Sequence, residues 1–499
     1  MLLLGIDVGT SSIKLSVVNA ETQQAIVSVQ YPETETGISS PKPGWAEQSP
    51  EMWWLHVQEA ILKANATRQY DPKEIGAIGI GYQMHGLVLV DKEQKVLRDS
   101  IIWCDSRAVE TGSMAFHTIG EEKCLSHLLN SPGNFTASKL AWVKHQEPAV
   151  YEKIHAVLLP GDFIAMKFTG TTTTTVSALS EGIFWDFKTN NLSEDVFNYY
   201  GFSNALIPEI KKVFEPHGFL KEQVAATLSL KTGIPVSYKA GDQLNNALSL
   251  NVLQPGEIAA TAGTSGVIYS VSDQLAYDPQ SRVNSFAHVN HTAGQTRLGI
   301  LLCINGTGIM NNWLRNITGN HLGYAQMNDA ARTVSPGSDG LFVLPFGNGA
   351  ERMLGNATVQ AHFHNIDLNK HTAAHIYRAA QEGIAFSFRY GLDIMRENGL
   401  QPTVIRAGKA NLFLSDVFAA SFVNATKAPV ELYACDGSVG AAIGAGLGAG
   451  IYADEKEAFR YMQKLASIEP EQESFYDEQY YQWKELLEQR ITGNQSYNK

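Results

Sequence analysis

Hydrophobic and polar positions divide the chain into short apolar runs and amphipathic stretches, a pattern typical of mixed α/β proteins. The apolar run at residues 2–6 predicts a strand at the very start. Residues 75–81 and 87–91 predict two more strands around the polar insertion 83–86, and residues 235–238 predict another. Helical spacing over 139–150 and over the aromatic, charged segment 471–489 predicts helices.

The pattern of residues 3–19 recurs in residues 257–273. Gly9-Thr10-Ser11 in the first segment corresponds to Gly263-Thr264-Ser265 in the second, each between two strand-like runs. Both copies predict a strand, a tight turn and a second strand. We therefore expect two related halves, divided near 245–256 where Pro255-Gly256 supplies a turn, and we assign the domains to residues 1–250 and 251–499.

Three other segments carry local expectations. The threonine run 171–175 follows a glycine, and its β-branched residues favour an exposed strand or a turn over a helix. Asp242 is expected to begin a helix that continues to residue 250. The Gly/Ala-rich segment 437–450 predicts a helix whose side chains are small enough to let another backbone approach closely.

Composition and charge narrow the class of protein. A chain of 499 residues is expected to form two domains of roughly 200 to 250 residues. The net charge of −12 argues against nucleic-acid binding, which needs a basic surface. No apolar run approaches the ~18 residues of a membrane span. The four cysteines stand far apart without a C-x-x-C pair, so neither zinc nor disulfides are indicated, and we expect free thiols in the cytoplasm.

The first Gly-Thr-Ser turn is a candidate anion site. Glycine lets the turn tighten while N–H and hydroxyl donors face one phosphate, and Asp7 could hold Mg²⁺ beside it. The alternative is a hairpin turn in which Asp7 only accepts backbone hydrogen bonds. The second copy has Thr261 in the place of Asp7, as expected if two loops hold one nucleotide and one of them holds the metal.

Three more positions could carry chemistry, each with a structural alternative. Asp242 is either a helix N-cap or a general base, and both can hold at once because a helix N-terminus is expected to keep the carboxylate ionised. His85, at the end of a predicted strand, either faces a cleft or is a satisfied structural histidine. Trp103 could stack on a sugar ring, whereas Asp105 and Arg107 could simply pair across a loop.

Four segments extend these motifs: GYQMHG at 81–86, WCDSR at 103–107, NFTASKLAW at 134–142 and AGDQ at 240–243. With them the sequence resembles the FGGY carbohydrate kinases, and within these the xylulokinases, over nearly the whole chain to about residue 450. The resemblance implies an α/β fold of two ribonuclease-H/actin-like domains, with a cleft for ATP and sugar between them.

The resemblance also implies roles by position. Asp242 corresponds to the catalytic base and Asp7 to the carboxylate that organises Mg²⁺ and ATP. The implied sugar contacts are Gln83, Met84, His85, Trp103, Asp242 and Gln243. The implied nucleotide-site residues are Thr10, Ser11, Lys14, Thr264, Gly308, Asn312, Gly408 and Asn411.

Departures from the family pattern cluster in the second half. Lys409 stands where a third glycine is usual, close to the expected adenosine site, and Asn365 replaces another glycine. The usual G-E-R-T-P segment is GAERM at 349–353. In the first half, Asn134 replaces a small residue and Cys104 stands where Asn is common. The sugar side is therefore expected to be better preserved than the nucleotide side.

The leading hypothesis is transfer of the ATP γ-phosphoryl group to the terminal hydroxyl of a ketopentose, with the Q-M-H-G segment pointing to D-xylulose. Kinases for another ketose, a polyol or a sugar acid are alternatives. A sensor that binds sugar and nucleotide without turnover is another, which Lys409 keeps open, whereas the Q-M-H segment and Asp242 speak against actin-like filaments and chaperone ATPases. The expected partners are a sugar and ATP, without nucleic acid or membrane, and a homodimer is left open.

Overall fold

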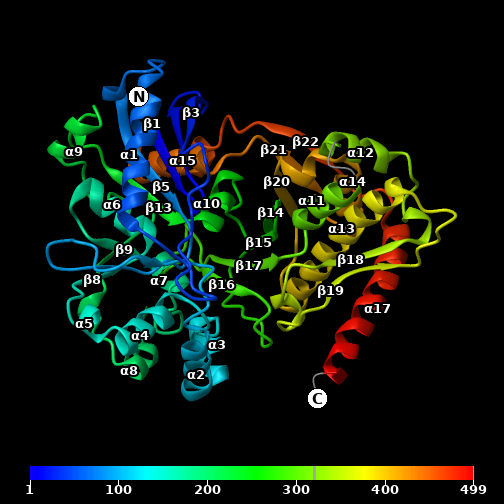
Figure 1. Cartoon of the computed structure of the whole chain (residues 1–499). Helices are drawn as coiled ribbons and strands as arrows, with labels where there is room; N and C mark the ends of the chain where they lie inside the picture. Colours follow the sequence, from blue (N-terminus) through cyan, green and yellow to red (C-terminus); the bar gives the residue numbers. More distant parts are fainter. Residues whose placement is uncertain (319–321, 498–499) are drawn as a thin grey trace.

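The computed structural model describes residues 1–318 and 322–497, which form two lobes around two central β-sheets (Figure 1). The first sheet contains β1 (Leu2–Val8), β2 (Ile13–Asn19), β3 (Ala25–Tyr31), β5 (Ile75–Tyr82) and β13 (Val236–Gly241). The second contains β14 (Glu257–Ala262), β15 (Gly266–Ser272), β16 (Asn284–Ala287), β17 (Leu298–Ile304), β20 (Val404–Gly408), β21 (Val430–Tyr433) and β22 (Lys464–Ile468). Short strand pairs involve β4 (Glu47–Gln48), β6 (Val88–Val90), β7 (Ser100–Ile101), β8 (Ala156–Leu158), β9 (Thr173–Thr175), β10 (Trp185–Asp186), β11 (Asn191–Leu192), β12 (Glu209–Lys211), β18 (Phe342–Phe346) and β19 (Gln360–His364).

Helices surround both sheets. Up to residue 250 they are α1 (Pro50–Ala66), α2 (Val109–Ile119), α3 (Glu121–Leu128), α4 (Thr136–Gln146), α5 (Pro148–Tyr151), α6 (Pro160–Thr169), α7 (Val176–Glu181), α8 (Glu194–Tyr200), α9 (Glu222–Thr227) and α10 (Asp242–Ser249). Beyond it they are α11 (Gly308–Thr318), α12 (Tyr324–Arg332), α13 (Ala373–Glu397), α14 (Asp416–Thr426), α15 (Gly437–Gly448), α16 (Glu455–Ala458) and α17 (Glu473–Tyr497). None of the helices described combines the length and the apolar composition that crossing a membrane would require.

The two sheets share one topology. In the first, the order is β13-β5-β1-β2-β3, with β1 antiparallel to β2 and parallel to β5. In the second, the order β21-β20-β14-β15-β17 repeats it, with β14 antiparallel to β15 and parallel to β20, and β16 and β22 extend the edges. The predicted pair of strand–turn–strand units is confirmed, because each unit forms the central hairpin of its own sheet.

Helix α15 follows β21 of the second sheet but packs on the first one (Figure 1). Leu4 and Ile6 of β1 belong to the core on the side of α1, so the intervening Gly5 faces the opposite side. A Cβ atom on Gly5 would lie 1.8 Å from the carbonyl oxygen of Ser438, and one on Gly79 would lie 2.0 Å from that of Ala441. The predicted close approach of another backbone to this helix is confirmed.

Two local predictions need correction. The helix expected over 139–150 is interrupted at Glu147, since the residue before Pro148 disfavours helical dihedral angles, and α4 and α5 are separate. The threonine run does form strand β9, but it is buried rather than exposed. Its Thr173 carbonyl accepts a hydrogen bond from the buried Lys239 ammonium, which also pairs with Asp162.

Candidate functional site

Asp7 lies near the end of β1, where three parts of the chain meet. In the sheet it is opposite Lys14 on β2 and beside Gly81 on β5. A Cβ atom on Gly437, the first residue of α15, would lie only 2.7 Å from the Asp7 Oδ2 atom. Burial raises the pKa of Asp7 to about 6 against the lowering effect of Lys14, and the charge of Asp436 raises it further. The carboxylate thus occupies a site that disfavours its negative charge unless a cation is near.

Asp242 begins α10 directly after β13, as predicted, but the N-cap of this helix is Gly241. The expectation that the helix N-terminus keeps Asp242 ionised is wrong. Burial raises the pKa of Asp242 to about 7, and the charge of Asp7 raises it further, whereas hydrogen bonds from Gln243 lower it. Desolvation and a like charge therefore outweigh the helix terminus, and Asp242 has a pKa suited to a general base near neutral pH.

Thr10 joins residues expected at the sugar to the first phosphate loop. Its hydroxyl accepts a hydrogen bond from the Trp103 indole N–H at 3.0 Å and donates one to the Gln83 Oε1 atom at 3.1 Å. Gln83 is 2% exposed, and its amide also donates to Gln48. The Gln83 side chain is thus bonded to Thr10 and Gln48 in this structure, and its contact with a sugar stays a prediction.

Trp103 remains 54% exposed, while its neighbours Asp105 and Arg107 are paired with each other. The Arg107 Nη2 atom lies 2.7 Å from the Asp105 Oδ2 atom, and both side chains are almost fully buried. The structural alternative for these two residues is confirmed, whereas Trp103 keeps an exposed aromatic face.

Met84 and His85 lie beside the start of α10. A Cβ atom on Gly241 would be 2.6 Å from the Met84 Cγ atom, so Met84 packs against the residue before Asp242. Burial and the nearby Lys139 lower the pKa of His85 to about 3, so its imidazole is neutral at physiological pH. The Nδ1 atom lies 3.1 Å from the carbonyl oxygen of Glu181. Because a carbonyl only accepts, Nδ1 carries the proton and Nε2 is left as an acceptor.

A cavity of about 830 Å³ lies in the second lobe, at the second Gly-Thr-Ser turn. It brings together four of the predicted nucleotide-site residues: Thr264, Gly308, Asn312 and Asn411. Gly408 and Lys409 are not among its lining residues, and Lys409 is exposed at the end of β20. Of the first loop, Ser11 and Lys14 are likewise exposed.

The wall of this cavity is built by close backbone contacts. The Gly308 N–H donates to the carbonyl of Gly263 at 2.9 Å, and a Cβ atom on Gly308 would lie 2.3 Å from that oxygen. Glu351, from the altered segment 349–353, accepts hydrogen bonds from the backbone N–H groups of Asn305 and Gly306. The departure in this segment therefore keeps the carboxylate that holds the loop before α11.

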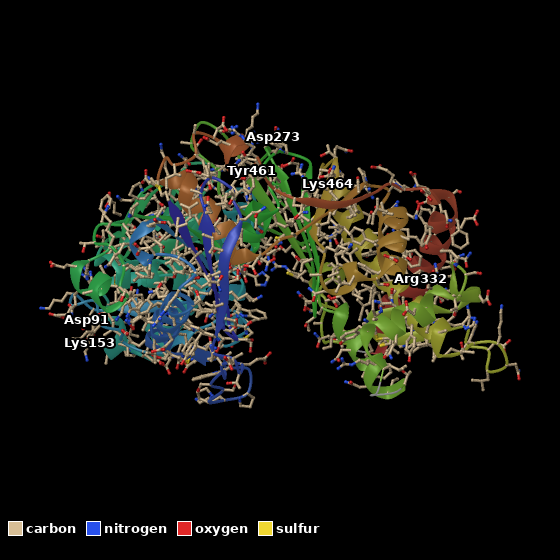
Figure 2. All side chains as sticks on the ribbon, turned by 90° about the horizontal axis from the view of Figure 1, so that it is seen from above. Asp91, Lys153, Asp273, Arg332, Tyr461 and Lys464 are labelled. Carbon is tan, nitrogen blue, oxygen red and sulfur yellow. The ribbon has the colours of Figure 1, made fainter. Side chains whose placement is uncertain are left out.

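Sequence reasoning missed one face of the cavity and one residue near His85. Tyr324, Asn328 and Arg332 of α12 line the cavity, and Arg332 is marked on the second lobe in Figure 2. Their spacing of four residues, which places polar groups on one helix face, was the signal available. Glu181 is fully buried beside His85, and no pattern in the sequence around residue 181 indicates this position.

Asn365, which replaces a typical glycine, has a left-handed backbone with φ of 64°. Asparagine tolerates this conformation better than most residues, so the substitution preserves the turn. Its side-chain amide also donates to the carbonyl of Gly340 at 3.2 Å.

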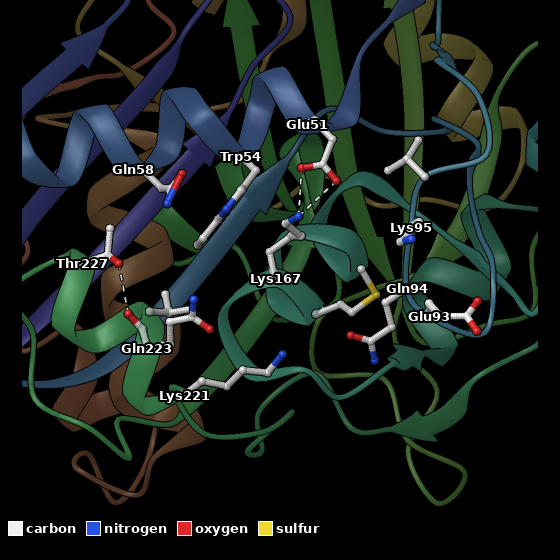
Figure 3. A pocket seen from close by; sticks show the side chains of 13 residues that line it. Glu51, Trp54, Gln58, Glu93, Gln94, Lys95, Lys167, Lys221, Gln223 and Thr227 are labelled. Atoms are coloured by element: carbon white, nitrogen blue, oxygen red, sulfur yellow. Dashed lines mark hydrogen bonds and ion pairs between the residues drawn. The ribbon is translucent and has the colours of Figure 1, made fainter.

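A separate pocket of about 620 Å³ opens on the first lobe between α1, α6 and α9 (Figure 3). None of the predicted site residues lines it. Lysines and glutamates are mixed around it, and Lys167 is paired with Glu51 at 2.8 Å (Figure 3). This pocket therefore shares no lining residue with the cavity of the second lobe.

Comparison with known proteins agrees with this geometry. Sequence models of the N-terminal and C-terminal domains of the FGGY family of carbohydrate kinases match residues 2–249 and 258–449. A xylulose kinase from Klebsiella pneumoniae is 28% identical over 410 residues, which are 82% of each chain. The structure of a xylulose kinase from Rhodospirillum rubrum is similar with a TM-score of 0.87 at 26% identity, over 97% of this chain and 98% of that one.

A gluconate kinase from Lactobacillus acidophilus has the same fold, with a TM-score of 0.88 at 22% identity over 99% of both chains. The predicted α/β fold of two actin-like lobes is confirmed by these structures. With both domain models matched in order along one chain and with relatives aligned over most of it, the protein belongs to the FGGY family of carbohydrate kinases.

Proposed function

We propose that this kinase transfers the γ-phosphoryl group of ATP to the terminal hydroxyl of an open-chain ketopentose, D-xylulose. The observation that carries the proposal is the place of Asp242 at the start of α10, where Met84 packs against the preceding Gly241 and the charge of Asp7 raises the pKa of Asp242. A base between a sugar loop and a phosphate loop is what transfer to a hydroxyl requires. The xylulose kinases among its relatives support this acceptor.

Asp242 acts as the general base in this proposal. With its pKa raised to about 7, its carboxylate can take the proton of a hydroxyl as the oxygen attacks the γ-phosphorus. A carboxylate of ordinary pKa would bind that proton less strongly. As the bond from the sugar oxygen to the γ-phosphorus forms, the bond between the γ-phosphorus and the bridging oxygen breaks, ADP leaves, and Asp242 carries the proton of the hydroxyl.

His85 serves as a fixed acceptor for a second hydroxyl of the sugar. Its ring is neutral and its Nδ1–H faces the Glu181 carbonyl, so Nε2 offers a lone pair. Phe135 packs edge-on against the ring, with centroids 4.8 Å apart, which holds the plane of the imidazole. The exposed face of Trp103 supplies an apolar surface for the carbon chain.

The residues around Asp7 fit a divalent cation. Asp7 is a carboxylate whose pKa is raised to about 6 by burial, and near it the buried Asn245 has an Oδ1 atom with no hydrogen-bond partner in the described chain. Carboxylate and amide oxygens are ligands that Mg²⁺ accepts, so Asp7 would hold the ion, with Asn245 as a second oxygen donor. When bound there, Mg²⁺ neutralises charge that develops on the phosphate oxygens.

The nucleotide is proposed to occupy the cavity of the second lobe. The cavity's volume of about 830 Å³ is within the range of small-molecule sites. Backbone groups of the second Gly-Thr-Ser turn lie at its edge, and α12 adds Tyr324 and Arg332. The proposal places the phosphates between this turn and the first Gly-Thr-Ser turn. The first lobe then holds the sugar, the second lobe holds ATP, and Asp242 lies at the attacking hydroxyl.

The experiment is a panel of acceptors at fixed ATP and Mg²⁺, containing D-xylulose, other ketoses, a polyol and D-gluconate. We expect D-xylulose to have the highest kcat/KM and Asp242→Asn to lower its kcat by about 100-fold or more. Asparagine is the chosen substitution because it keeps the size and polarity of the side chain but cannot act as the base. If Asp242→Asn is as fast as the wild type, Asp242 is not the base. If another acceptor in the panel has a higher kcat/KM, D-xylulose is not the preferred sugar. If the sugar binds without being phosphorylated, the protein is not a kinase for it.

A further inference from the structure

His85 has a left-handed backbone conformation, which is uncommon for residues other than glycine. Its φ is 61°, in the left-handed region that favours glycine. Such a residue keeps this conformation only when its surroundings enforce it, and residues of this kind cluster at functional sites. The glycine that follows, Gly86, serves a different purpose, because a Cβ atom there would lie 2.7 Å from the Cγ atom of Pro160.

Glu181 supplies two of the contacts that enforce it. The backbone N–H of His85 donates to the Glu181 Oε1 atom at 3.2 Å, and the His85 Nδ1 atom donates to the Glu181 carbonyl at 3.1 Å. Glu181 is the last residue of α7 and has no exposed surface. One residue thus fixes both the backbone and the ring of His85.

Lys139 holds the same residue from its other side. Its ammonium donates to the carbonyl of His85 at 2.8 Å and to the carbonyl of Ile102 at 3.0 Å, and the side chain is fully buried. Because Ile102 precedes Trp103, one ammonium ties together the two segments that face the proposed sugar. Burial lowers the pKa of Lys139 to about 7, which is a cost of placing it there.

The second carboxyl oxygen of Glu181 has no hydrogen-bond partner within the described residues. It lies 2.6 Å from the position that a Cβ atom on Gly241 would take, directly before Asp242. Buried polar atoms without partners are rare, and each calls for an explanation beyond packing. One carboxyl oxygen of Glu181 therefore bonds to His85, the other lies next to Gly241 before Asp242, and the side chain is not exposed to solvent.

We propose that Glu181 is a positioning residue of the acceptor site, which holds His85 in its left-handed conformation with Nδ1 protonated and Nε2 turned to the sugar. Lys139 completes the support through the His85 carbonyl. The inference rests on the proposed function for the role of Nε2, but the tautomer and the conformation can be measured without any turnover.

The kinetic arm compares Glu181→Ala with Glu181→Gln. Glutamine keeps an oxygen that can accept from the His85 N–H, so its sugar KM is expected to stay within about threefold of the original. Alanine removes that acceptor, and its sugar KM is expected to rise about tenfold while the KM for ATP stays unchanged. Glu382→Ala is the control, since Glu382 is also a buried glutamate but lies in α13 of the second lobe.

Each kinetic outcome decides the matter. If Glu181→Ala leaves the sugar KM unchanged, or raises both KM values together as a general loss of structure would, the positioning role is overturned. If Glu382→Ala raises the sugar KM equally, the effect belongs to buried glutamates in general and the role is overturned as well. If the alanine variant does not fold, the second arm, which measures the tautomer of His85, still tests the proposal.

The second arm measures the His85 tautomer by ¹⁵N NMR of histidine-labelled protein, with the resonances assigned by their loss in His85→Asn. The expected spectrum has a protonated Nδ1 and a bare Nε2 in the wild type. The same tautomer is expected in Glu181→Gln. In Glu181→Ala or, if that variant is unstable, in Lys139→Met, the backbone of His85 loses one of its two supports, so we expect the ring to move away from the carbonyl of residue 181 and a mixture of tautomers to appear. A protonated Nε2 in the wild type would overturn the inference, even if the acceptor panel supports D-xylulose. If the expected tautomer is found but no sugar of the acceptor panel is phosphorylated, the proposed function alone is overturned.

Discussion

The indole N–H of Trp103 donates a hydrogen bond to the hydroxyl of Thr10, across 3.0 Å. Trp103 belongs to a segment expected at the sugar, and Thr10 belongs to the first Gly-Thr-Ser turn, expected at the phosphates. The two ligands of a phosphoryl transfer must be aligned within fractions of an ångström, so a direct bond between their binding segments is a means of alignment.

This bond predicts energetic coupling between the two residues. Trp103→Phe removes the donor but keeps an aromatic face, and Thr10→Val removes the hydroxyl but keeps the shape. Each variant is expected to lose about 2- to 10-fold in kcat/KM for the sugar, and the double variant is expected to lose less than the product of the two. The measurement is kcat/KM for all four proteins. Strictly multiplicative losses would mean that the bond contributes nothing to catalysis.

The raised pKa of Asp242 predicts how activity depends on pH. In the proposed mechanism the deprotonated form is the base. Because its pKa is about 7, kcat/KM should fall about tenfold per pH unit below 7 and be level above it. Gln243→Leu removes the side-chain hydrogen bond that lowers this pKa and keeps the backbone one, so the falling limb should move to higher pH. Profiles of kcat/KM for both proteins test this. A limb near pH 4 in the wild type would contradict the influence of burial and of Asp7.

The left-handed backbone of Asn365 predicts an unusual order of stability. Asn365→Gly loses the hydrogen bond to Gly340 but relaxes the backbone, whereas Asn365→Ala loses the bond and keeps a Cβ atom at φ of 64°. The alanine variant should therefore be less stable than the glycine variant by about 1 kcal/mol. Denaturant unfolding of the two variants measures the difference, and equal free energies of unfolding would argue against a strained backbone.

The contact between Gly79 and α15 predicts a strong effect of one added methyl group. In Gly79→Ala the new Cβ atom would lie 2.0 Å from the Ala441 carbonyl, so the helix must shift away from the sheet. We expect a loss of about 3 kcal/mol or more in the free energy of unfolding. Gly294→Ala, at a glycine with nothing within 4 Å, is the control and should change it little. Similar melting temperatures for the two variants would show that the helix tolerates displacement.

The sequence predicted elements whose determinants are local. The strand–turn–strand units at Gly9 and Gly263 were found because a tight turn between apolar runs leaves a pattern within seventeen residues, and their repetition predicted the common topology. Four nucleotide-site residues inferred from family resemblance do line one cavity. The interruption at Glu147 could also have been predicted, since Pro148 follows it.

Relationships between distant segments were not predictable in the same way. Neither the packing of α15 on β1 nor the position of Glu181 beside His85 leaves a local pattern, because each depends on how separate segments meet. The charge state of Asp242 was mistaken for the same reason. A helix start is visible in sequence, but the burial of the carboxylate and its nearness to Asp7 exist only in the folded chain.

The position of α15 also constrains how the chain acquires its structure during synthesis. All strands of the first sheet have been made once the chain reaches Gly241. One face of this sheet, however, is covered by α15, which ends at Gly448. While a ribosome makes the segment in between, that face lacks the cover of α15 and has mainly α10 of the first half against it. We therefore expect the first half of this kinase to reach its native packing only once α15 has been made, and separately produced halves to need each other to fold.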